Sequence, residues 1–261
     1  MTILLHELKQ NRVSFLVWTA AIGFLLAICV FMFPEMEGEM EGVTDMFASM
    51  GSFTAAFGMD RLDFGSFIGF YAVECGNILG LGGAFFAALI AISSLAKEEK
   101  ERTAEFLLAH PVSRAKIITE KFLSVMIQIV LMNLLIFGIA IASTVLIGED
   151  IPWRELGLLH LANVMLQAEL ACVCFGISAF LRRGGLGIGL GLAAVLYFLN
   201  IIANISEKAE FLKYITPFSY TEATDIIAEN SLDGTLILYG MICALFFLIL
   251  GYVKYCKKDI A

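Results

Sequence analysis

Charged residues are scarce in this sequence. Aspartate, glutamate, lysine and arginine make up 16% of the 261 residues, while 59% are hydrophobic and the mean hydropathy is +0.86. A soluble domain carries about 25% charged residues. The deficit excludes an ordinary soluble domain and indicates a chain whose surface is solvated largely by lipid.

The sequence also lacks the motifs of several enzyme classes. No GxxxxGK[ST] segment occurs, so the chain has no P-loop for ATP. HExxH is absent, and the three histidines supply a metal site poorly. Ser178, in FGISAF, has neither the GxSxG frame nor a plausible histidine partner. We therefore expect no catalytic residue, no metal ligand and no cofactor bound by this chain, and no enzymatic activity of its own.

Paired cysteines and a cleavable signal are missing as well. The six cysteines fall mostly inside apolar runs and form no CxxC pair, which favours buried small side chains over disulfides or a metal site. The first apolar run has no small-residue cleavage site before Pro34. We therefore expect this run to be retained as a membrane span.

Long apolar runs dominate what remains. A bilayer core about 30 Å thick needs roughly 20 apolar residues per helix. Only helices and closed barrels pair every backbone group in lipid, and these runs are too unbroken for the alternation of barrel strands. We predict an all-α polytopic membrane protein, a single transmembrane domain over residues 1–261. Its six spans are expected at 13–33, 71–96, 117–147, 158–181, 186–205 and 234–253.

The basic residues predict the orientation of these spans. With the N-terminus in the cytoplasm, every lysine and arginine except Arg61, Arg154, Lys208 and Lys213 lies on the cytoplasmic side. An even number of spans then places both termini in the cytoplasm, as expected for a multi-pass plasma-membrane protein. Acidic residues gather in the first outer loop, which is either a solvated loop or a surface that favours cationic cargo.

Two segments outside the spans are amphipathic. Residues 1–12 place Ile3, Leu4, Leu5 and Leu8 within two helical turns, among Glu7, Lys9 and Arg12, and predict a short interfacial helix at the inner membrane surface. Residues 206–233 form an outer segment that Pro217 divides into two halves. Its apolar side chains could return it to the membrane, where such backbone must be covered by protein or line a cavity. They are Phe211, Leu212, Ile215, Phe218 and Tyr220.

Glycines recur in the second and fifth spans. Gly76, Gly80 and Gly83 would let a neighbouring backbone approach the second span closely. In the fifth span, the pairs Gly185/Gly189 and Gly187/Gly191 have GxxxG spacing, which predicts close helix packing within the chain or across a dimer.

A few polar residues lie at bilayer depth. Glu169 is midway along the fourth span, with Asn163 and Gln167 nearby. A charge at the centre of a membrane helix costs roughly 2.5–3.5 kcal/mol on insertion scales, so Glu169 should face protein or water. The three residues are candidates for a substrate path. The alternative is a protonated or hydrogen-bonded contact between helices.

The most informative stretch is the charged island 97–121, KEEKERTAEFLLAHPVSRAKIITEK, between two spans. The apolar block 106–109 sits among its charges and is closed by Pro111, which a merely solvated loop would not require. Pro111 disfavours helix at the preceding residue, and Ser113 is then a natural N-cap for the third span. The block either docks a cytosolic partner or lies in the lipid interface.

The island resembles the loop between the second and third spans of ABC-2-type transporter permeases. That family's pattern runs roughly E-(K/R)-G-T-x-E-x-L-L-A-x-P-V-S-R, followed by a lysine, and Arg102 stands where the family usually has glycine. The matching residues here are Glu101, Arg102, Thr103, Glu105, Leu107, Leu108, Ala109, Pro111, Val112, Ser113, Arg114 and Lys121.

The resemblance implies an ABC-2-type (type V-like) permease in which residues 97–115 form a cytoplasmic coupling helix. In this family the helix inserts into a cleft of a separate cytosolic ATPase, which holds ATP and Mg²⁺. Two ATPase copies and a second permease copy or paralogue are the implied partners, together with the lipid bilayer and no nucleic acid. The implied coupling residues are Glu101, Arg102, Thr103, Glu105, Phe106, Leu107, Leu108, His110, Pro111 and Arg114.

The function that follows is the membrane subunit of an ABC exporter, which couples ATP hydrolysis by its partner to efflux. Small members of this build resemble exporters of amphipathic or antimicrobial peptides, including phenol-soluble-modulin-type toxins. The Phe- and Met-rich outer half suits such cargo because these side chains adapt to varied apolar surfaces. Alternatives are a permease for lipid, polysaccharide, drug or sodium and, in another class, a membrane-embedded enzyme or free-standing channel.

Overall fold

The computed structural model describes residues 2–36, 51, 54, 56, 62, 63, 65–97, 112–181 and 185–257. These ranges are overwhelmingly helical and contain no strand. Within them, six helical stretches are long and apolar enough to cross a membrane. The prediction of an all-α polytopic protein with six spans is confirmed.

Several spans are longer than their apolar runs. A helix satisfies its own backbone hydrogen bonds, so it can continue past the hydrocarbon into the polar interface. The spans are α1 (Thr2–Met36); α4 (Phe67–Glu74), η2 (Cys75–Leu81) and α5 (Gly82–Ser94) in one line; α8 (Arg114–Ile147); α9 (Trp153–Ser178); α10 (Leu186–Ile205); and α12 (Gly234–Lys257). The connection from α10 to α12 holds η3 (Glu207–Tyr214), η4 (Ser219–Thr221) and α11 (Ala223–Glu229).

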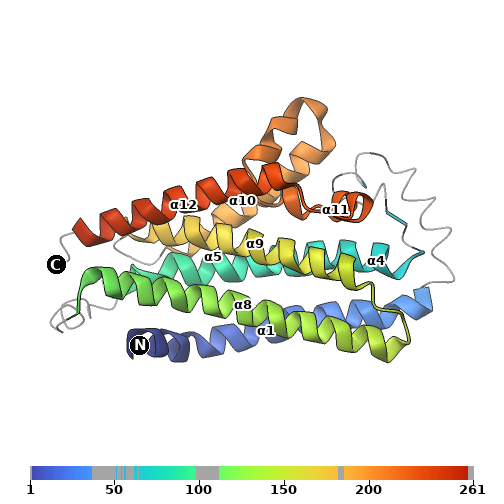
Figure 1. Ribbon diagram of the computed structural model, residues 1–261, viewed down its shortest axis with the longest axis horizontal. Helices are drawn as coiled ribbons and strands as arrows, with labels where there is room; N and C mark the ends of the chain where they lie inside the picture. The colour runs from blue at the N-terminus through green and yellow to red at the C-terminus, as the bar shows by residue number, and fades with distance from the viewer. Residues whose placement is uncertain are drawn as a thin grey trace.

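The amphipathic segment at the start of the chain is the first part of α1. Residues 2–12 run directly into the first span as one helix rather than forming a separate element. No glycine or proline precedes Gly23, so nothing in the sequence breaks the helix there. The whole of α1 packs along α8 at one side of the bundle (Figure 1).

Helix α9 is the centre of the bundle. It packs against α5, α12 and α8, and Figure 1 shows it running between α12 and α8. In its most apolar stretch 72% of the residues are buried, against 11% for α12. The polar side chains of α9 therefore meet protein rather than lipid, as an ionisable residue at this depth requires.

Small residues allow the closest helix contacts. A Cβ at Gly176 of α9 would collide with the backbone carbonyl of Phe247 in α12, and a Cβ at Gly251 of α12 would collide with the backbone of Gly176. Gly189 of α10 lies against α5, so its predicted close packing is confirmed within the chain. A Cβ added at Gly187 or Gly191 would meet no other described element within 4 Å.

The middle of the second span, η2, is a π-helix of seven residues. Its glycines make room for polar side chains rather than for a neighbouring backbone. Gly83, in the following turn, is covered by the amide of Gln167, and a Cβ at Gly80 would lie 3.2 Å from Asn163 Oδ1. A Cβ at Gly76 would meet no atom of the described residues within 4 Å. Two of these glycines thus seat amides of α9, and the third borders open space.

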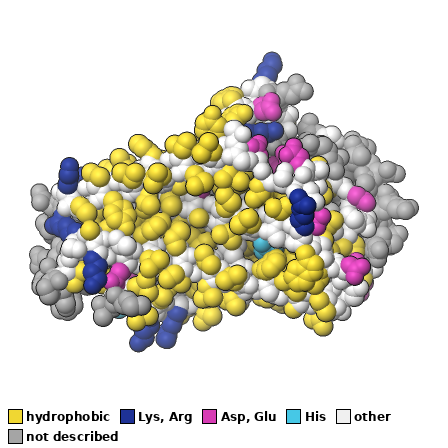
Figure 2. Space-filling model, viewed as in Figure 1, with side chains coloured by type: hydrophobic (Ala, Val, Ile, Leu, Met, Phe, Trp, Pro, Cys, Tyr) yellow, Lys and Arg dark blue, Asp and Glu magenta, His cyan; other side chains and the backbone are white. Residues whose placement is uncertain are grey.

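The two ends of the bundle differ in charge. The start of α1, the end of α12, the end of α5 and the start of α8 lie at one end (Figure 1). On the face in Figure 2, hydrophobic side chains run the length of the bundle. Most visible lysines and arginines lie towards the end that holds the termini, and most visible acids lie towards the other end. The cytoplasmic orientation of the termini stays a prediction.

Both halves of the outer segment contact the helices, but the side chains of its two halves differ in burial. Phe218 and Tyr220 are buried, whereas Phe211 and Ile215 are exposed. The hydroxyl of Thr216 donates to a carbonyl of α10 at 2.8 Å and so anchors the return. The apolar side chains of the segment therefore divide between the bundle and the surface. Its return to membrane depth stays a prediction.

Candidate functional site

Most of the coupling residues implied by the sequence lie outside the described residues. Only Arg114 is described, and it is the first residue of α8. The others are Glu101, Arg102, Thr103, Glu105, Phe106, Leu107, Leu108, His110 and Pro111. The structure does describe the residues on either side of this segment, up to residue 97 after α5 and from residue 112 before α8.

The flank at α8 is capped as predicted. Ser113 has extended backbone, and its side chain accepts a hydrogen bond from the N–H of Lys116 at 3.3 Å. Such an N-cap satisfies one of the unpaired amides of the first helical turn. Next to it, Arg114 Nη1 donates to the carbonyl of Cys256 at 3.4 Å, which joins the start of α8 to the end of α12.

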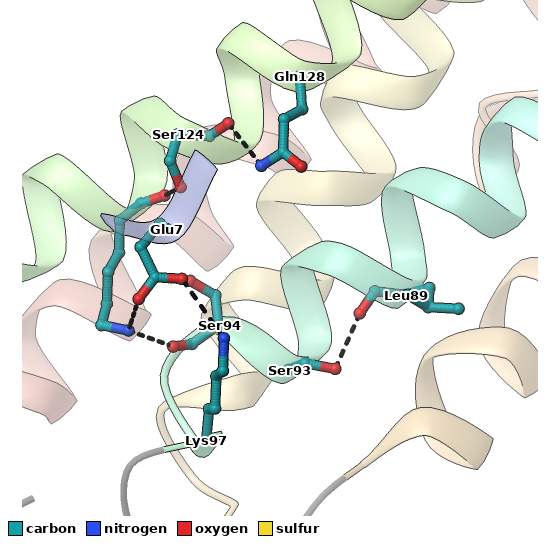
Figure 3. Close-up of polar contacts among 8 residues, drawn as sticks. Glu7, Leu89, Ser93, Ser94, Lys97, Ser124 and Gln128 are labelled. Atoms are coloured by element: carbon teal, nitrogen blue, oxygen red, sulfur yellow. Dashed lines mark hydrogen bonds and ion pairs between the residues drawn. The ribbon is translucent and has the colours of Figure 1, made fainter. Parts of the chain in front are cut away.

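A buried ion pair lies beside both flanks. Lys121 of α8 is fully buried, and its Nζ donates to Glu7 Oε1 at 2.7 Å and to the carbonyl of Ser94 at 2.9 Å. Lys97 Nζ stands 3.9 Å from the other oxygen of Glu7. Figure 3 shows Glu7, Ser94 and Lys97 converging. This group, which we call the Lys121 cluster, ties α1, the end of α5 and the start of α8 together.

Glu120 adds a second link between α1 and α8. Its Oε2 accepts the backbone N–H of Leu4 at 3.1 Å. Leu4 lies in the first turn of α1, where helical N–H groups lack partners and the helix dipole favours a negative charge. The N-terminal turn of α1 is therefore held on α8 by both a carboxylate cap and the Lys121 cluster.

Sequence reasoning counted Lys121 among the basic residues of the cytoplasmic side and matched it to the lysine of the family pattern, but it did not predict this cluster. A signal was present, because Lys121 opens the apolar stretch KFLSVMIQIV, where a charge must be paired or reach water. Its partner could not be inferred. Glu7 is 114 residues away, on a helix whose pairing with α8 appears only in three dimensions.

The three substrate-path candidates on α9 do not form one site. Gln167 Oε1 accepts from Asn133 Nδ2 of α8 at 2.6 Å, and Asn163 Nδ2 lies 3.9 Å from the sulfur of Cys75 in η2. Glu169 faces α12 and η4 instead. Asn163 and Gln167 are thus contacts between helices. The substrate-path role of all three stays a prediction.

Glu169 is bonded to the outer segment. Its Oε2 accepts the hydroxyl of Tyr220 at 3.0 Å, and its carboxyl packs on Gly240 of α12. Burial, and then the neighbouring carboxyl, raises the pKa of Tyr220 well above its ordinary range, so this hydroxyl keeps its proton and donates. This hydrogen bond holds the second half of the outer segment against α9.

A polar cavity lies between η2, α10 and the outer segment. Glu222 Oε1 accepts hydrogen bonds from the amides of Asn200 and Asn204, one turn apart on α10. The hydroxyl of Tyr197 donates to Asn77 Oδ1 at 3.3 Å. Sequence reasoning missed this site, although two asparagines at i,i+4 in an apolar span were an available signal. Among the described residues, no three His, Cys, Asp or Glu side chains are placed to hold a metal ion.

Comparison with known proteins agrees with the helical frame. A family model described as "ABC-2 family transporter protein" matches residues 1–260. The chain is also 26% identical over 221 residues to "Uncharacterized protein YhcI" of Bacillus subtilis (strain 168), an alignment that covers 73% of this chain and 68% of that protein. With six spans and a family match over nearly its whole length, the chain belongs to the ABC-2 family of transporter proteins.

Proposed function

We propose that this membrane subunit drives export and that residues 97–115 couple it to a cytosolic ATPase. ABC-2 permeases work with ABC ATPase partners, and two ATPase copies with a second permease copy complete the proposed assembly. The observation that carries the coupling role is the Lys121 cluster. Its members hold both flanks of the segment that bears the family motif.

The cluster gives the proposed coupling a mechanical basis. A force applied between residues 97 and 114 acts on the end of α5 and the start of α8. Both are bonded to α1 through Lys121 and Glu7, so the three helices move together rather than separately. Packed interfaces of this kind respond by rigid-body shifts between discrete arrangements. ATPase closure would thus open or close a path along the bundle.

The test removes the apolar block. Phe106→Ala with Leu107→Ala deletes two large side chains worth on the order of 3–6 kcal/mol if the ATPase buries them fully. We expect loss of ATPase co-purification with normal membrane insertion. Leu134→Ala with Leu135→Ala, two exposed apolar residues of α8, is the matched control and should retain the ATPase. Retention of the ATPase and normal transport by the first variant would overturn the proposal.

The proposed cargo is an amphipathic peptide. Its support is the composition of the segment between α1 and α4, which is rich in methionine and phenylalanine. Inside-out vesicles with the ATPase should accumulate a labelled amphipathic helical peptide when ATP is added. A scrambled peptide of equal composition, which lacks a continuous apolar face, is the control. Equal accumulation of both, or of neither, would remove the peptide assignment and leave the coupling proposal standing.

A further inference from the structure

The cavity beside Glu222 is large enough for a small ligand group. The cavity has a volume of about 40 Å³, and one water needs about 10–15 Å³. Its walls come from η2 (Gly76, Asn77), α10 (Tyr197, Asn200) and the stretch 218–223 that includes Glu222. Ala56 and two residues of α4, Ala72 and Val73, complete the lining, and the space has room for a few waters or one compact polar head group.

Two hydrogen-bond acceptors of the cavity are incompletely satisfied. Glu222 Oε1 already accepts the amides of Asn200 and Asn204, and no hydrogen bond to its other oxygen occurs among the described residues. Asn200 is 5% exposed, yet its Oδ1 has no hydrogen-bond partner among the described residues. A buried acceptor without a donor costs about 1–3 kcal/mol. Two acceptors of the cavity, the second oxygen of Glu222 and Asn200 Oδ1, therefore have room for a further donor.

The charges around Glu222 also favour a positively charged ligand. Burial raises the pKa of Glu222, the amides of Asn204 and Asn200 oppose the rise, Asp225 adds to it and Lys213 opposes it. A partly buried carboxylate that only neutral amides contact is poorly compensated. A positively charged donor in the cavity would satisfy both the carboxylate and the unpaired amide oxygen.

The backbone opens the cavity on its η2 side. A π-helix closes its hydrogen bonds over five residues rather than four, and such turns are frequent at functional sites. Here the π-helix presents Gly76 to open space and Asn77 to Tyr197. Because Gly76 has no side chain, a ligand group can lie directly against the backbone of η2 at this position.

We propose that this cavity binds an ammonium group of the cargo, either an N-terminal amine or a lysine side chain. An ammonium is a compact cation with three donors and no acceptor. Glu222, Asn200 Oδ1 and Asn77 Oδ1 offer acceptors to those donors. The identification of the amine as cargo rests on the exporter function proposed above, whereas binding of the amine does not.

The first experiment measures binding without ATPase or nucleotide. The purified full chain is titrated with n-butylammonium chloride, and the melting temperature or the heat of binding is followed. We expect saturable binding that n-butanol, with the same apolar stem, does not reproduce. Glu222→Gln should weaken binding at least tenfold, while Glu229→Gln, an exposed acid of α11, should leave it unchanged. Equal binding by Glu222→Gln, or no binding by the unaltered chain, would overturn the proposal.

Two further arms separate folding and ligand identity. Gly76→Ala adds a methyl group into open space, so the chain should fold normally and bind n-butylammonium more weakly. Normal binding by this variant would place the amine elsewhere. Sodium or potassium chloride that protects as well as n-butylammonium would assign the cavity to inorganic cations and overturn the ammonium site.

A last arm connects the cavity to cargo. An amphipathic peptide with free amines should displace n-butylammonium, and the same peptide with all amines acetylated should not. Failure of the free peptide to compete would reject cargo amines. Phe106→Ala with Leu107→Ala should bind n-butylammonium normally while losing the ATPase, so failure of coupling and failure of the cavity give different results.

Discussion

Replacing Lys121 with methionine tests the Lys121 cluster most directly. Methionine keeps an unbranched side chain of similar length but removes the charge and the bonds to Glu7 and Ser94. Glu7 is 3% exposed, so its carboxyl would stay buried without its partner at 2.7 Å. Removing one member of a buried ion pair costs about 3–5 kcal/mol. Lys97, at 3.9 Å, would compensate in part, which favours the lower end of that range.

The assay is thermal unfolding of the purified chain in one detergent. A loss of 1 kcal/mol lowers the melting temperature by about 2–4 °C for a chain near this size, so Lys121→Met should melt roughly 6–12 °C lower. Lys116→Met is the matched control. Lys116 is 59% exposed and pairs with Glu120 at 4.0 Å, and exposed pairs contribute about 1 kcal/mol or less.

Removing both charges should restore stability. In Glu7→Leu with Lys121→Met no buried charge is left alone, and replacement of a buried pair by apolar residues is often neutral or stabilising. The double variant should therefore melt well above Lys121→Met. The double variant also tests coupling independently of stability, because α1 would lose its polar contacts with α5 and α8. Melting of Lys121→Met within about 2 °C of Lys116→Met would refute the buried-pair argument.

Three other predictions concern orientation, α9 and the cavity. An external thiol label should react with cysteines placed at positions 40 and 225 and not at 100 or 258. External labelling at position 100 would contradict the predicted cytoplasmic orientation of the termini. Glu169→Gln should keep assembly intact because an amide oxygen still accepts from Tyr220, and an unchanged transport rate would assign Glu169 to structure alone. Binding of n-butylammonium should weaken as the pH falls through the raised pKa of Glu222, because protonation removes the charge that attracts the cation. Tyr197, Asp225 and Lys213 also face this carboxyl. The required control is therefore that binding by Glu222→Gln does not change with pH.

The six spans were predictable because lipid imposes a strong local rule. About 20 apolar residues in a row leave helix as the only structure that pairs its backbone. The helix starts were less accurate: α8 begins at Arg114 rather than 117, and α9 at Trp153 rather than 158. Charged residues such as Lys116 mark the end of an apolar run, but they do not end a helix that has reached the polar interface.

The polar contacts inside the bundle were much less predictable. Glu169 was recognised because a carboxyl at mid-span stands out, but its partner Tyr220 lies 51 residues away in an irregular segment. Glu222 was not singled out from the sequence, because only the fold of the outer segment places it beside α10. The local sequence pattern indicates which side chains are unusual for their position. The partner of each depends on how the helices cross.

The π-helix in the second span has a consequence for how that span is mapped. An α-helix turns by about 100° per residue, and a π-helix turns by less. Over the seven residues of η2 the difference accumulates, so α4 and α5 are out of phase with each other. A single helical wheel drawn from Phe67 to Ser94 therefore assigns residues of one half to the wrong face. Each half of the span requires its own wheel, and the change of phase falls at the wall of the cavity.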